Sequence, residues 1–484
     1  MNRSHRWPHL IAVALIAAAV SACDISGVGS GNRPEKLEII RNPNTSLIDL
    51  GGEVEQYFLC FPEQLQAVLR FSNGNVDASS LLNTRVRWSS SDPAVVQVSN
   101  DPRTGGEVVL IPGSTDRAFA PGILVPRSVG TATITAEFVG LTSADFKVQI
   151  REFDSVTINK TAVKLAPETG DLLTLTATVD GYTLDVTSSP LWSFDTDDEN
   201  ANQIATIGQS TGLITGVGIG GPLTAKAEFP LCTDNPRYSN FTATVVVEAL
   251  TGLQITREFA DAPNDELIVA TSERISATGS FADGATMDLT GQVRLESSDA
   301  QIATALITAP QFLSALKAGT VQIQAVYGGD DDNDEEGDTD PPQVRSNTIT
   351  LNVVDGELQD FQIAPSNPTI NARGFQQFVA IGSFNVAGQT RSQTITRGVV
   401  WSDTTLNDES TAEVTAFSDL LRAGRVVSNS VEAGTYKITA TRGLPSSGGS
   451  GNASIVRSTV LCVVKPNTPE ATCPPPEEGE ESTP

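Results

Sequence analysis

VRWSSSDPAVVQV, residues 86–98, is a phrase that recurs three more times along this 484-residue chain. The later copies read LWSFDTDDENANQIATI at 191–207, RLESSDAQIATA at 294–305 and VVWSDTTLNDESTAEV at 399–414. Their anchor residues lie 104, 103 and 106 residues apart and are Trp88, Trp192, Leu295 and Trp401. A period of about 100 residues lets each copy bury a core of its own. The repeat therefore predicts a tandem array of four domains and not a solenoid of small units.

A second phrase follows each anchor and alternates like a half-buried strand. It reads VGTATITAEF at 129–138, GPLTAKAEF at 221–229, AGTVQIQAVY at 318–327 and AGTYKITATR at 433–442. In the first copy Ala132, Ile134 and Ala136 alternate with threonines, which is the period of a strand with one buried face. Frequent turn signals and the lack of a helical stripe indicate an all-β chain. We therefore expect four tandem immunoglobulin-like, open antiparallel β-sandwich domains in an elongated array, with the anchors in their cores.

The two phrases together resemble a known repeat family. Trp-Ser-Ser-Ser-Asp at 88–92 and Gly-Thr-Ala-Thr-Ile-Thr-Ala at 130–136 are similar to bacterial immunoglobulin-like repeats of group 2 (Big2). The first and fourth units match best, whereas the third has Leu295 at the tryptophan position. The resemblance implies the sandwich fold. It implies little about function, because such modules serve adhesins, stalks and enzyme accessory regions alike.

The amino-terminal 22 residues predict an export signal, since the apolar run Leu10–Val20 follows a polar start. Val-Ser-Ala-Cys at 20–23 resembles the lipobox of bacterial lipoproteins, which implies a diacylglycerol on Cys23 and durable anchoring by two or more acyl chains. Ordinary cleavage after Ala22 is the alternative. We expect an exported protein, lipid-anchored to the bacterial cell membrane or outer membrane and facing the periplasm or the exterior.

The expected organisation follows from the repeat and from composition shifts. It comprises a lipoprotein signal peptide at 1–22, a flexible tether at 23–35, domains at 36–152, 153–250, 251–355 and 356–465, and a disordered acidic, proline-rich tail at 466–484.

Composition excludes several function classes. The chain carries 58 acidic against 31 basic residues, a formal charge of −27, so nucleic acid is an unsuitable partner. The two histidines, His5 and His9, precede the apolar run. Without them the mature chain has no Ser-His-Asp or Cys-His catalysis and no imidazole metal site.

Four cysteines remain after Cys23, and pairing is expected in an oxidising compartment, with three possible connectivities. In an immunoglobulin-like topology Cys60 precedes strand B of the first domain and Cys232 lies at the tip of the F–G hairpin of the second. Both positions face the same domain junction. We therefore predict Cys60–Cys232 and Cys462–Cys473 disulfides, with free or intermolecular thiols as the alternative.

The sharpest charge feature is GGDDDNDEEGDTDPP at 328–342, in the F–G hairpin of the third domain. Weak calcium binding there would use Asp332, Asp334, Glu336 and Asp338. Position twelve of an EF-hand-like loop would be Gln343 and not the bidentate glutamate, and no flanking helices are expected. A solvated acidic loop is the preferred interpretation, and no other cofactor is expected.

Carbohydrate binding would need exposed aromatic platforms. The recurring tryptophans belong to the core, and Tyr327 and Tyr436 occupy inward strand positions, which leaves Tyr57, Tyr182 and Tyr238 as candidates. The segment 101–128 occurs in the first unit alone, and we expect it to fold over its own domain, with a contact loop as the alternative.

These features favour a non-enzymatic, lipid-anchored cell-envelope protein, a rod of immunoglobulin-like domains for surface or periplasmic interaction or adhesion with a protein or glycan partner. The alternative is a structural spacer or assembly subunit without a ligand of its own. A glycan-acting enzyme is a remote alternative, because no pair of carboxylates or cleft is marked in the sequence.

Overall fold

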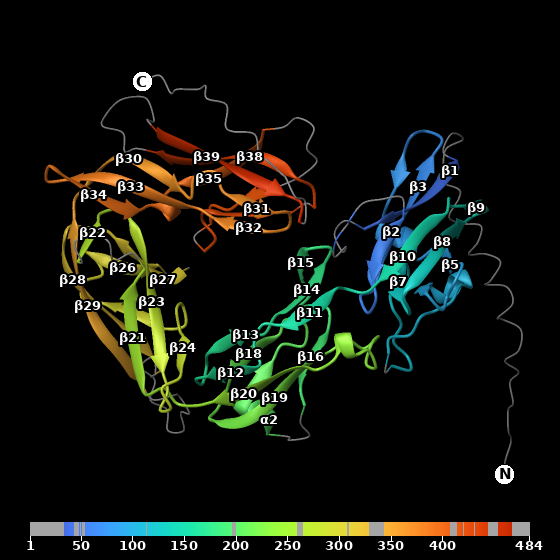
Figure 1. The fold of residues 1–484 in the computed structure, drawn as a ribbon, viewed down its shortest axis with the longest axis horizontal. Coiled ribbons are helices and arrows are strands. Elements are labelled where there is room, and N and C mark those ends of the chain that lie inside the picture. The colour runs from blue at the N-terminus through green and yellow to red at the C-terminus, as the bar shows by residue number, and fades with distance from the viewer. Residues whose placement is uncertain are drawn as a thin grey trace, which may run out of the picture. The chain divides into compact units, whose positions relative to one another are not determined.

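The computed structural model describes residues 33–42, 48, 50, 54–112, 114–195, 200–258, 265–306, 309–328, 343–406, 414–419, 421–429, 431–443 and 454–466. Over these ranges the chain is mainly β, and its strands form four successive sandwiches (Figure 1). The predicted all-β tandem array is confirmed. The described residues divide into two compact units: one runs to Glu152 and includes Pro230–Cys232, and the other holds Phe153–Phe229 and the residues from Thr233 onward.

The first sandwich has two sheets, with strand orders β1-β3-β7-β6 and β2-β10-β8-β5. The short strands β4 and β9 extend β3 and β8 as hairpins. Its elements are β1 (Pro34–Arg41), β2 (Glu55–Phe58), β3 (Glu63–Phe71), β4 (Val76–Asp77), α1 (Ser80–Asn83), β5 (Arg87–Ser90), β6 (Val96–Val98), η1 (Pro102–Thr104), β7 (Ile123–Pro126), β8 (Gly130–Phe138), β9 (Leu141–Thr142) and β10 (Phe146–Arg151).

The third sandwich repeats this plan, with orders β21-β23-β27-β26 and β22-β29-β28-β25. Its strands are β21 (Gly252–Arg257), β22 (Glu266–Ile268), β23 (Ser272–Ser280), β24 (Thr286–Asp288), β25 (Arg294–Ser297), β26 (Ala303–Leu306), β27 (Ala309–Ala315), β28 (Gly319–Tyr327) and β29 (Val344–Val354).

The second and fourth sandwiches keep one four-stranded sheet but divide the other into two three-stranded sheets. The second contains β11 (Ser155–Ile158), β12 (Ala162–Leu165), β13 (Gly170–Leu172), β14 (Leu175–Val179), β15 (Tyr182–Asp185), β16 (Leu191–Phe194), α2 (Ala201–Ile204), β17 (Ala205–Ile207), β18 (Leu213–Gly216), β19 (Gly220–Glu228), η2 (Pro236–Tyr238) and β20 (Phe241–Val247). The fourth contains β30 (Glu357–Ala364), β31 (Thr369–Asn371), β32 (Phe375–Gln377), β33 (Val379–Val386), β34 (Gln389–Thr394), η3 (Thr396–Gly398), β35 (Val400–Thr405), β36 (Val414–Ala416), β37 (Arg425–Ser428), β38 (Gly434–Gly443) and β39 (Ser454–Val464).

The division arises where the second long strand breaks beside a left-handed glycine. The Leu173 amide, between β13 and β14, donates to the Gly212 carbonyl at 3.0 Å, and the Phe378 amide, between β32 and β33, donates to Gly424 at 2.8 Å. Both glycines have positive φ, +66° and +77°, and a Cβ on either would lie within 2.4 Å of a backbone oxygen. Only glycine tolerates this conformation and approach together.

The sandwiches are not wholly antiparallel, contrary to the expectation from sequence. In each, a short early strand pairs parallel with the last strand: β2 with β10, β12 with β20, β22 with β29 and β31 with β39. The early strand leaves the first sheet and crosses to the second, so each sandwich is closed along one edge by a parallel pair. Alternation alone cannot reveal this, because it gives facing and not strand direction.

The anchor tryptophans lie in the cores, as predicted. Trp88, Trp192 and Trp401 are at most 4% exposed, whereas Leu295 is half-buried. Each indole N–H donates to the carbonyl five residues earlier, namely that of Asn83 at 3.3 Å, Thr187 at 2.8 Å and Thr396 at 2.9 Å.

The residue five positions before each anchor also bonds to the other sheet of its sandwich. Its side chain accepts from a backbone N–H of the opposite long strand in all four sandwiches, through the pairs Ala67–Asn83 (2.9 Å), Leu175–Thr187 (3.0 Å), Ala277–Thr290 (3.0 Å) and Ala380–Thr396 (3.0 Å). The third sandwich therefore loses the indole bond at Leu295 but keeps the hydroxyl bond of Thr290. Each repeat therefore contains a two-residue motif: a polar residue that bonds to the other sheet, followed five positions later by the anchor.

A cation near the end of the first strand meets a carboxylate near the start of its neighbour. In the third sandwich Arg257 Nη2 lies 2.7 Å from Glu273 Oε2, and both side chains are at most 7% exposed. In the first sandwich the pair is Arg41–Glu63, at 3.6 Å and equally buried. In the second it is Lys160–Asp171, at 2.5 Å, with side chains 40% and 29% exposed.

The segment 101–128 folds over its own domain, as expected. Its carboxyl part forms β7, which pairs with β3 and β6. Asn100, just before it, accepts from the Trp88 amide at 2.7 Å and donates to the Trp88 carbonyl at 3.1 Å. Val109 is 3% exposed.

Candidate functional site

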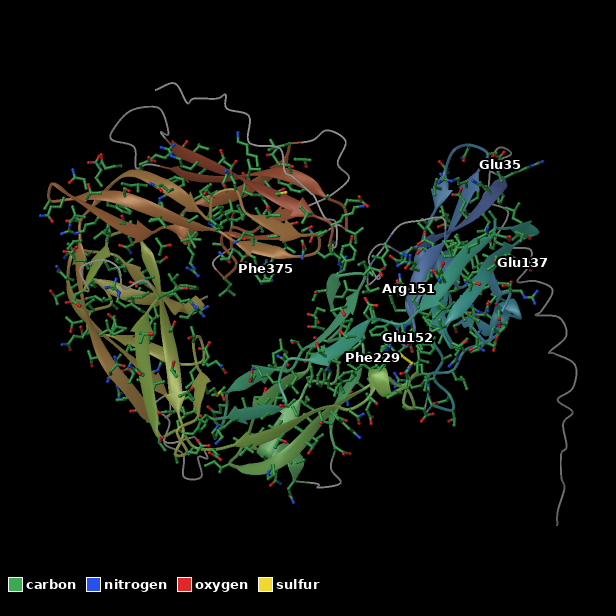
Figure 2. The ribbon with its side chains drawn as sticks, in the orientation of Figure 1. Glu35, Glu137, Arg151, Glu152, Phe229 and Phe375 are labelled. Atoms are coloured by element: carbon green, nitrogen blue, oxygen red, sulfur yellow. A yellow bond between two sulfur atoms is a disulfide. The ribbon has the colours of Figure 1, made fainter. Side chains whose placement is uncertain are left out.

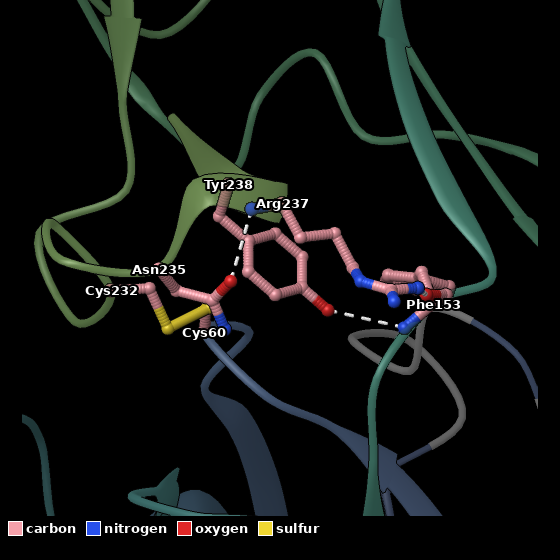
Figure 3. The surroundings of a disulfide bond; sticks show 6 residues. All are labelled: Cys60, Phe153, Cys232, Asn235, Arg237 and Tyr238. Carbon is pink, nitrogen blue, oxygen red and sulfur yellow. Dashed lines mark hydrogen bonds between the residues drawn. A yellow bond between two sulfur atoms is a disulfide. The ribbon is translucent and has the colours of Figure 1, made fainter. Parts of the chain in front are cut away.

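The Cys60–Cys232 disulfide joins segments 172 residues apart, with 5.6 Å between the Cα atoms (Figure 3). Cys60 lies between β2 and β3 with φ of 74°, and Cys232 lies in the connection from β19 to β20. This is the bond that the topology predicted. It brings Pro230–Cys232, which belong to the second sandwich by sequence, into the first compact unit.

The same β19–β20 connection holds the start of the second sandwich through side chains. Tyr238 Oη accepts from the Phe153 amide at 3.1 Å (Figure 3). Arg237 donates to the carbonyls of Phe153 and, at 2.9 Å, Asp154. Asn235 orients Arg237 by accepting from its amide at 3.0 Å. The backbone that enters the second sandwich is therefore held by bonds to a buried tyrosine and an arginine.

The three tyrosines that remained as possible carbohydrate platforms are buried, so none of them offers an exposed ring. Tyr57, Tyr182 and Tyr238 are 0%, 8% and 1% exposed. Tyr57 packs under the Arg41 guanidinium, 4.2 Å from the ring centroid. An exposed aromatic that the sequence analysis missed is Phe375 on β32, 58% exposed (Figure 2). Its only signal is a phenylalanine at the start of a strand, which does not differ from a core position in sequence.

Side chains also bridge the second and third sandwiches. Buried Tyr327 donates its hydroxyl to the Pro167 carbonyl, and burial raises the pKa of this phenol. Lys164 Nζ lies 3.0 Å from Glu248 Oε2 and 2.6 Å from Asp283 Oδ2. Bonding to these carboxylates raises the pKa of Lys164.

The third and fourth sandwiches are bridged by Gln393 of β34. Its Oε1 accepts from the Ile268 amide at 2.9 Å, and its Nε2 donates to Thr271 Oγ1 at 2.6 Å. Arg391, two residues earlier on the same strand, reaches Glu266 Oε2 at 3.1 Å. These bonds link β34 to β22 and to the turn that follows it.

A cavity of about 350 Å³ lies beside this turn and is lined by β27, η3 and the end of β38. The Arg397 guanidinium covers the buried Phe312 ring, 3.4 Å from its centroid. Arg442 donates to the carbonyls of Gly398 and, at 3.4 Å, Ala270. Burial lowers the pKa of Arg397 to about 10 and lowers that of Arg442, so both remain cationic near neutral pH but are partly desolvated.

Several predicted site residues lie outside the described residues. They are the lipidation candidate Cys23, the calcium candidates Asp332, Asp334, Glu336 and Asp338, and Cys473. Cys462 is disulfide-bonded, and its pairing with Cys473 stays a prediction.

In the part of the chain that the structure describes, no helix is long and apolar enough to cross a membrane. The described residues also contain no group of three or more His, Cys, Asp or Glu side chains arranged to hold a metal ion.

Comparison with known proteins gives one informative relative in sequence. The chain is 30% identical over 206 residues to ice-binding protein 1 of Shewanella frigidimarina. The match covers 43% of this chain and 20% of that protein, so the chain spans about a fifth of the relative's length. No protein-family profile matches, and the group-2 immunoglobulin-like assignment stays an expectation.

Comparison with solved structures returns tandem-domain proteins. Domains 4–9 of the surface layer protein SbsC match with 14% identity and a TM-score of 0.20, over 90% of this chain and 66% of that one. The four amino-terminal immunoglobulin domains of Dscam1 isoform 8.4 match with 10% identity and a TM-score of 0.19, over 89% of this chain and all of that one. TM-scores this low carry no functional argument.

Proposed function

We propose that this protein is a non-enzymatic, lipid-anchored cell-envelope protein whose tandem β-sandwiches present interaction surfaces for adhesion. The observation that carries the proposal is the number of side-chain bonds made where one sandwich follows another. The Tyr238 bond holds the Phe153 amide at the start of the second sandwich, and the Gln393 bridge joins β34 of the fourth sandwich to Ile268 of the third. Bonds of this kind support a tandem array of sandwiches that presents surfaces.

The anchoring part of the proposal rests on Cys23 and the lipobox-like residues before it. Cells that produce the full-length chain should incorporate a palmitate analogue into it and retain it with membranes, whereas a Cys23→Ser variant should lose the label and enter the soluble envelope fraction. A serine variant that stays equally membrane-bound and equally labelled would contradict the anchor. A spacer without a ligand is the competing role, and it predicts that deleting the gene leaves adhesion of cells to glycan, protein and ice surfaces unchanged.

Ice is a second candidate ligand, because the relative in sequence is an ice-binding protein. The outward face of one sheet in the second sandwich supports this candidate. On the outward face of the sheet β11-β14-β15, register partners place Ser155 beside Thr178 and Thr178 beside Thr183, while Thr157 lies beside Thr176. These hydroxyls are exposed or half-buried, and Ser155 and Thr178 are 2.8 Å apart. Sheet geometry places the residues of this face about 4.8 Å apart across strands and about 6.8 Å apart along them, so the hydroxyl-bearing positions form a regular array that can order water.

The test of this second candidate is inhibition of ice recrystallisation by the purified full-length chain. We expect activity that falls when Thr176 and Thr183 are both changed to lysine, because long charged side chains break the flat hydroxyl array. The matched control changes Thr133 and Thr135 to lysine. These threonines belong to β8 of the first sandwich. No inhibition by the unaltered protein, or equal loss in both double variants, would remove ice as the ligand of this face.

A further inference from the structure

Arg442 lines the cavity beside Arg397, and among the described residues its hydrogen bonds go to backbone carbonyls and not to a carboxylate. A guanidinium that is partly removed from water is stabilised most by a carboxylate, which accepts two parallel N–H bonds. The charge at this wall therefore favours an anionic ligand group.

Two hydroxyls also line the cavity. Ser272 of β23 and Ser314 of β27 are directly opposite in register and are half-buried. Neither hydroxyl has a hydrogen-bond partner within the described ranges, although each can donate one bond and accept two. They provide polar contacts for a ligand that itself carries hydroxyl groups.

The rest of the lining is aliphatic. Leu306 and Leu316 line the cavity, and Leu316 is 51% exposed at its rim. A volume of about 350 Å³ lies near the lower end of the usual range of small-molecule sites, about 300–1,000 Å³. The cavity therefore suits a single ring with an apolar face and not a long chain.

We propose that this cavity binds the carboxylate and hydroxyl groups of a sugar acid of the hexuronic type. Arg442 holds the carboxylate in a bidentate bond, and the neighbouring Arg397 adds a second cation on the ring of Phe312. Ser272 and Ser314 bond the sugar hydroxyls, and the leucines contact the apolar face of the ring. An inorganic anion would use the arginines alone, and an acidic peptide side chain would leave the two serines without their partners.

The biological use of such a ligand rests on the proposed envelope role, where acidic polysaccharides would be met. The binding itself is measured on purified protein and does not depend on lipidation. Loss of membrane association in cells and loss of sugar-acid binding in solution are therefore separate results.

The experiment is calorimetric titration of the full-length chain with glucuronate, glucuronate methyl ester, glucose, acetate and N-acetylaspartate. We expect glucuronate to bind and the methyl ester and glucose to bind at least about tenfold more weakly, because both lack the carboxylate charge. Acetate and N-acetylaspartate should also bind more weakly, since they cannot use the serines. Binding of acetate, or of N-acetylaspartate, as tight as that of glucuronate would overturn the sugar assignment.

Variants locate the site. Arg442→Lys keeps the charge but loses the fork, so it should weaken glucuronate at least about tenfold, and Ser314→Ala should weaken it by a smaller factor. The matched control is Arg345→Lys, an exposed arginine of β29 that pairs with Glu296 away from the cavity, and it should bind as the unaltered protein does. Thermal unfolding verifies that each variant is folded. Unchanged affinity in Ser314→Ala together with unchanged affinity in Arg442→Lys, or no glucuronate binding by the unaltered chain, would overturn the proposal.

Discussion

The buried Arg257–Glu273 pair and its exposed counterpart Lys160–Asp171 predict different costs for the same change within one chain. Each pair joins a cation near the end of the first strand of its sandwich to a carboxylate in or near the start of a later strand. Arg257 and Glu273 are 7% and 2% exposed and share three side-chain hydrogen bonds of 2.7–3.0 Å. Arg257 also donates to the Glu266 carbonyl at 2.8 Å.

Replacing Arg257 by methionine leaves a carboxylate buried without its cation, which costs about 3–5 kcal/mol. Replacing Lys160 by methionine breaks a pair that solvent screens, which costs about 0–1 kcal/mol.

Hydrogen exchange read by peptide is the appropriate assay, because a multidomain chain has no single free energy of unfolding. Amides of β23 should exchange roughly a hundred- to several-thousand-fold faster in Arg257→Met, which is the same 3–5 kcal/mol expressed as a rate ratio at 25 °C. Amides of β14 should change by less than about tenfold in Lys160→Met. An Arg257→Met/Glu273→Leu double variant should recover most of the loss, since no buried charge remains. Equal effects in the two single variants, or no recovery in the double variant, would refute the reasoning from burial.

Three further predictions follow from the cores, the disulfide and the first domain. Thr187→Val should cost about 1–3 kcal/mol in the second sandwich because the buried Leu175 amide loses its acceptor, while Thr187→Ser keeps that bond and serves as the control in the same exchange measurement. A Cys60→Ser/Cys232→Ser variant should be destabilised by up to about 5 kcal/mol, since the bond spans 172 residues, and its melting temperature should lie below that of the unaltered protein in calorimetry; equal melting temperatures would contradict this. Asp101 should titrate with a pKa of about 2 by NMR, because bonding to Arg103 stabilises its carboxylate, and Arg103→Ala should return it toward 3.8. Because that folded-state pKa is depressed, the associated stability is present above about 3.8 and is lost as the pH falls through about 2.

Periodicity and spacing determined the architecture because they report directly on burial. An anchor that recurs about every 104 residues must occupy one structural position, and Trp88, Trp192 and Trp401 do occupy equivalent core positions with the same indole bond. The Cys60–Cys232 bond was also predictable, because strand order alone places the two turns at one end of neighbouring domains.

The burial of individual side chains, the direction of paired strands and the approach of backbone segments were decided only by the tertiary structure. Tyr57, Tyr182 and Tyr238 fall at positions that strand alternation does not assign to a core, yet each is at most 8% exposed. The parallel pairing of β2 with β10 and the breaks beside Gly212 and Gly424 depend on strand direction and backbone approach, which a hydrophobic pattern does not encode.

The cavity with Arg397 and Arg442 is the furthest from prediction. Its lining comes from a turn after β22, the strand β27, the turn η3 and the end of β38, and in sequence these arginines resemble any solvated cation on a strand or loop. Local sequence determined that each sandwich would form, because burial of its own strands is a local requirement. Which side chains of two sandwiches converge on one cavity depends on contacts between residues more than a hundred positions apart, and only the folded chain brings them together.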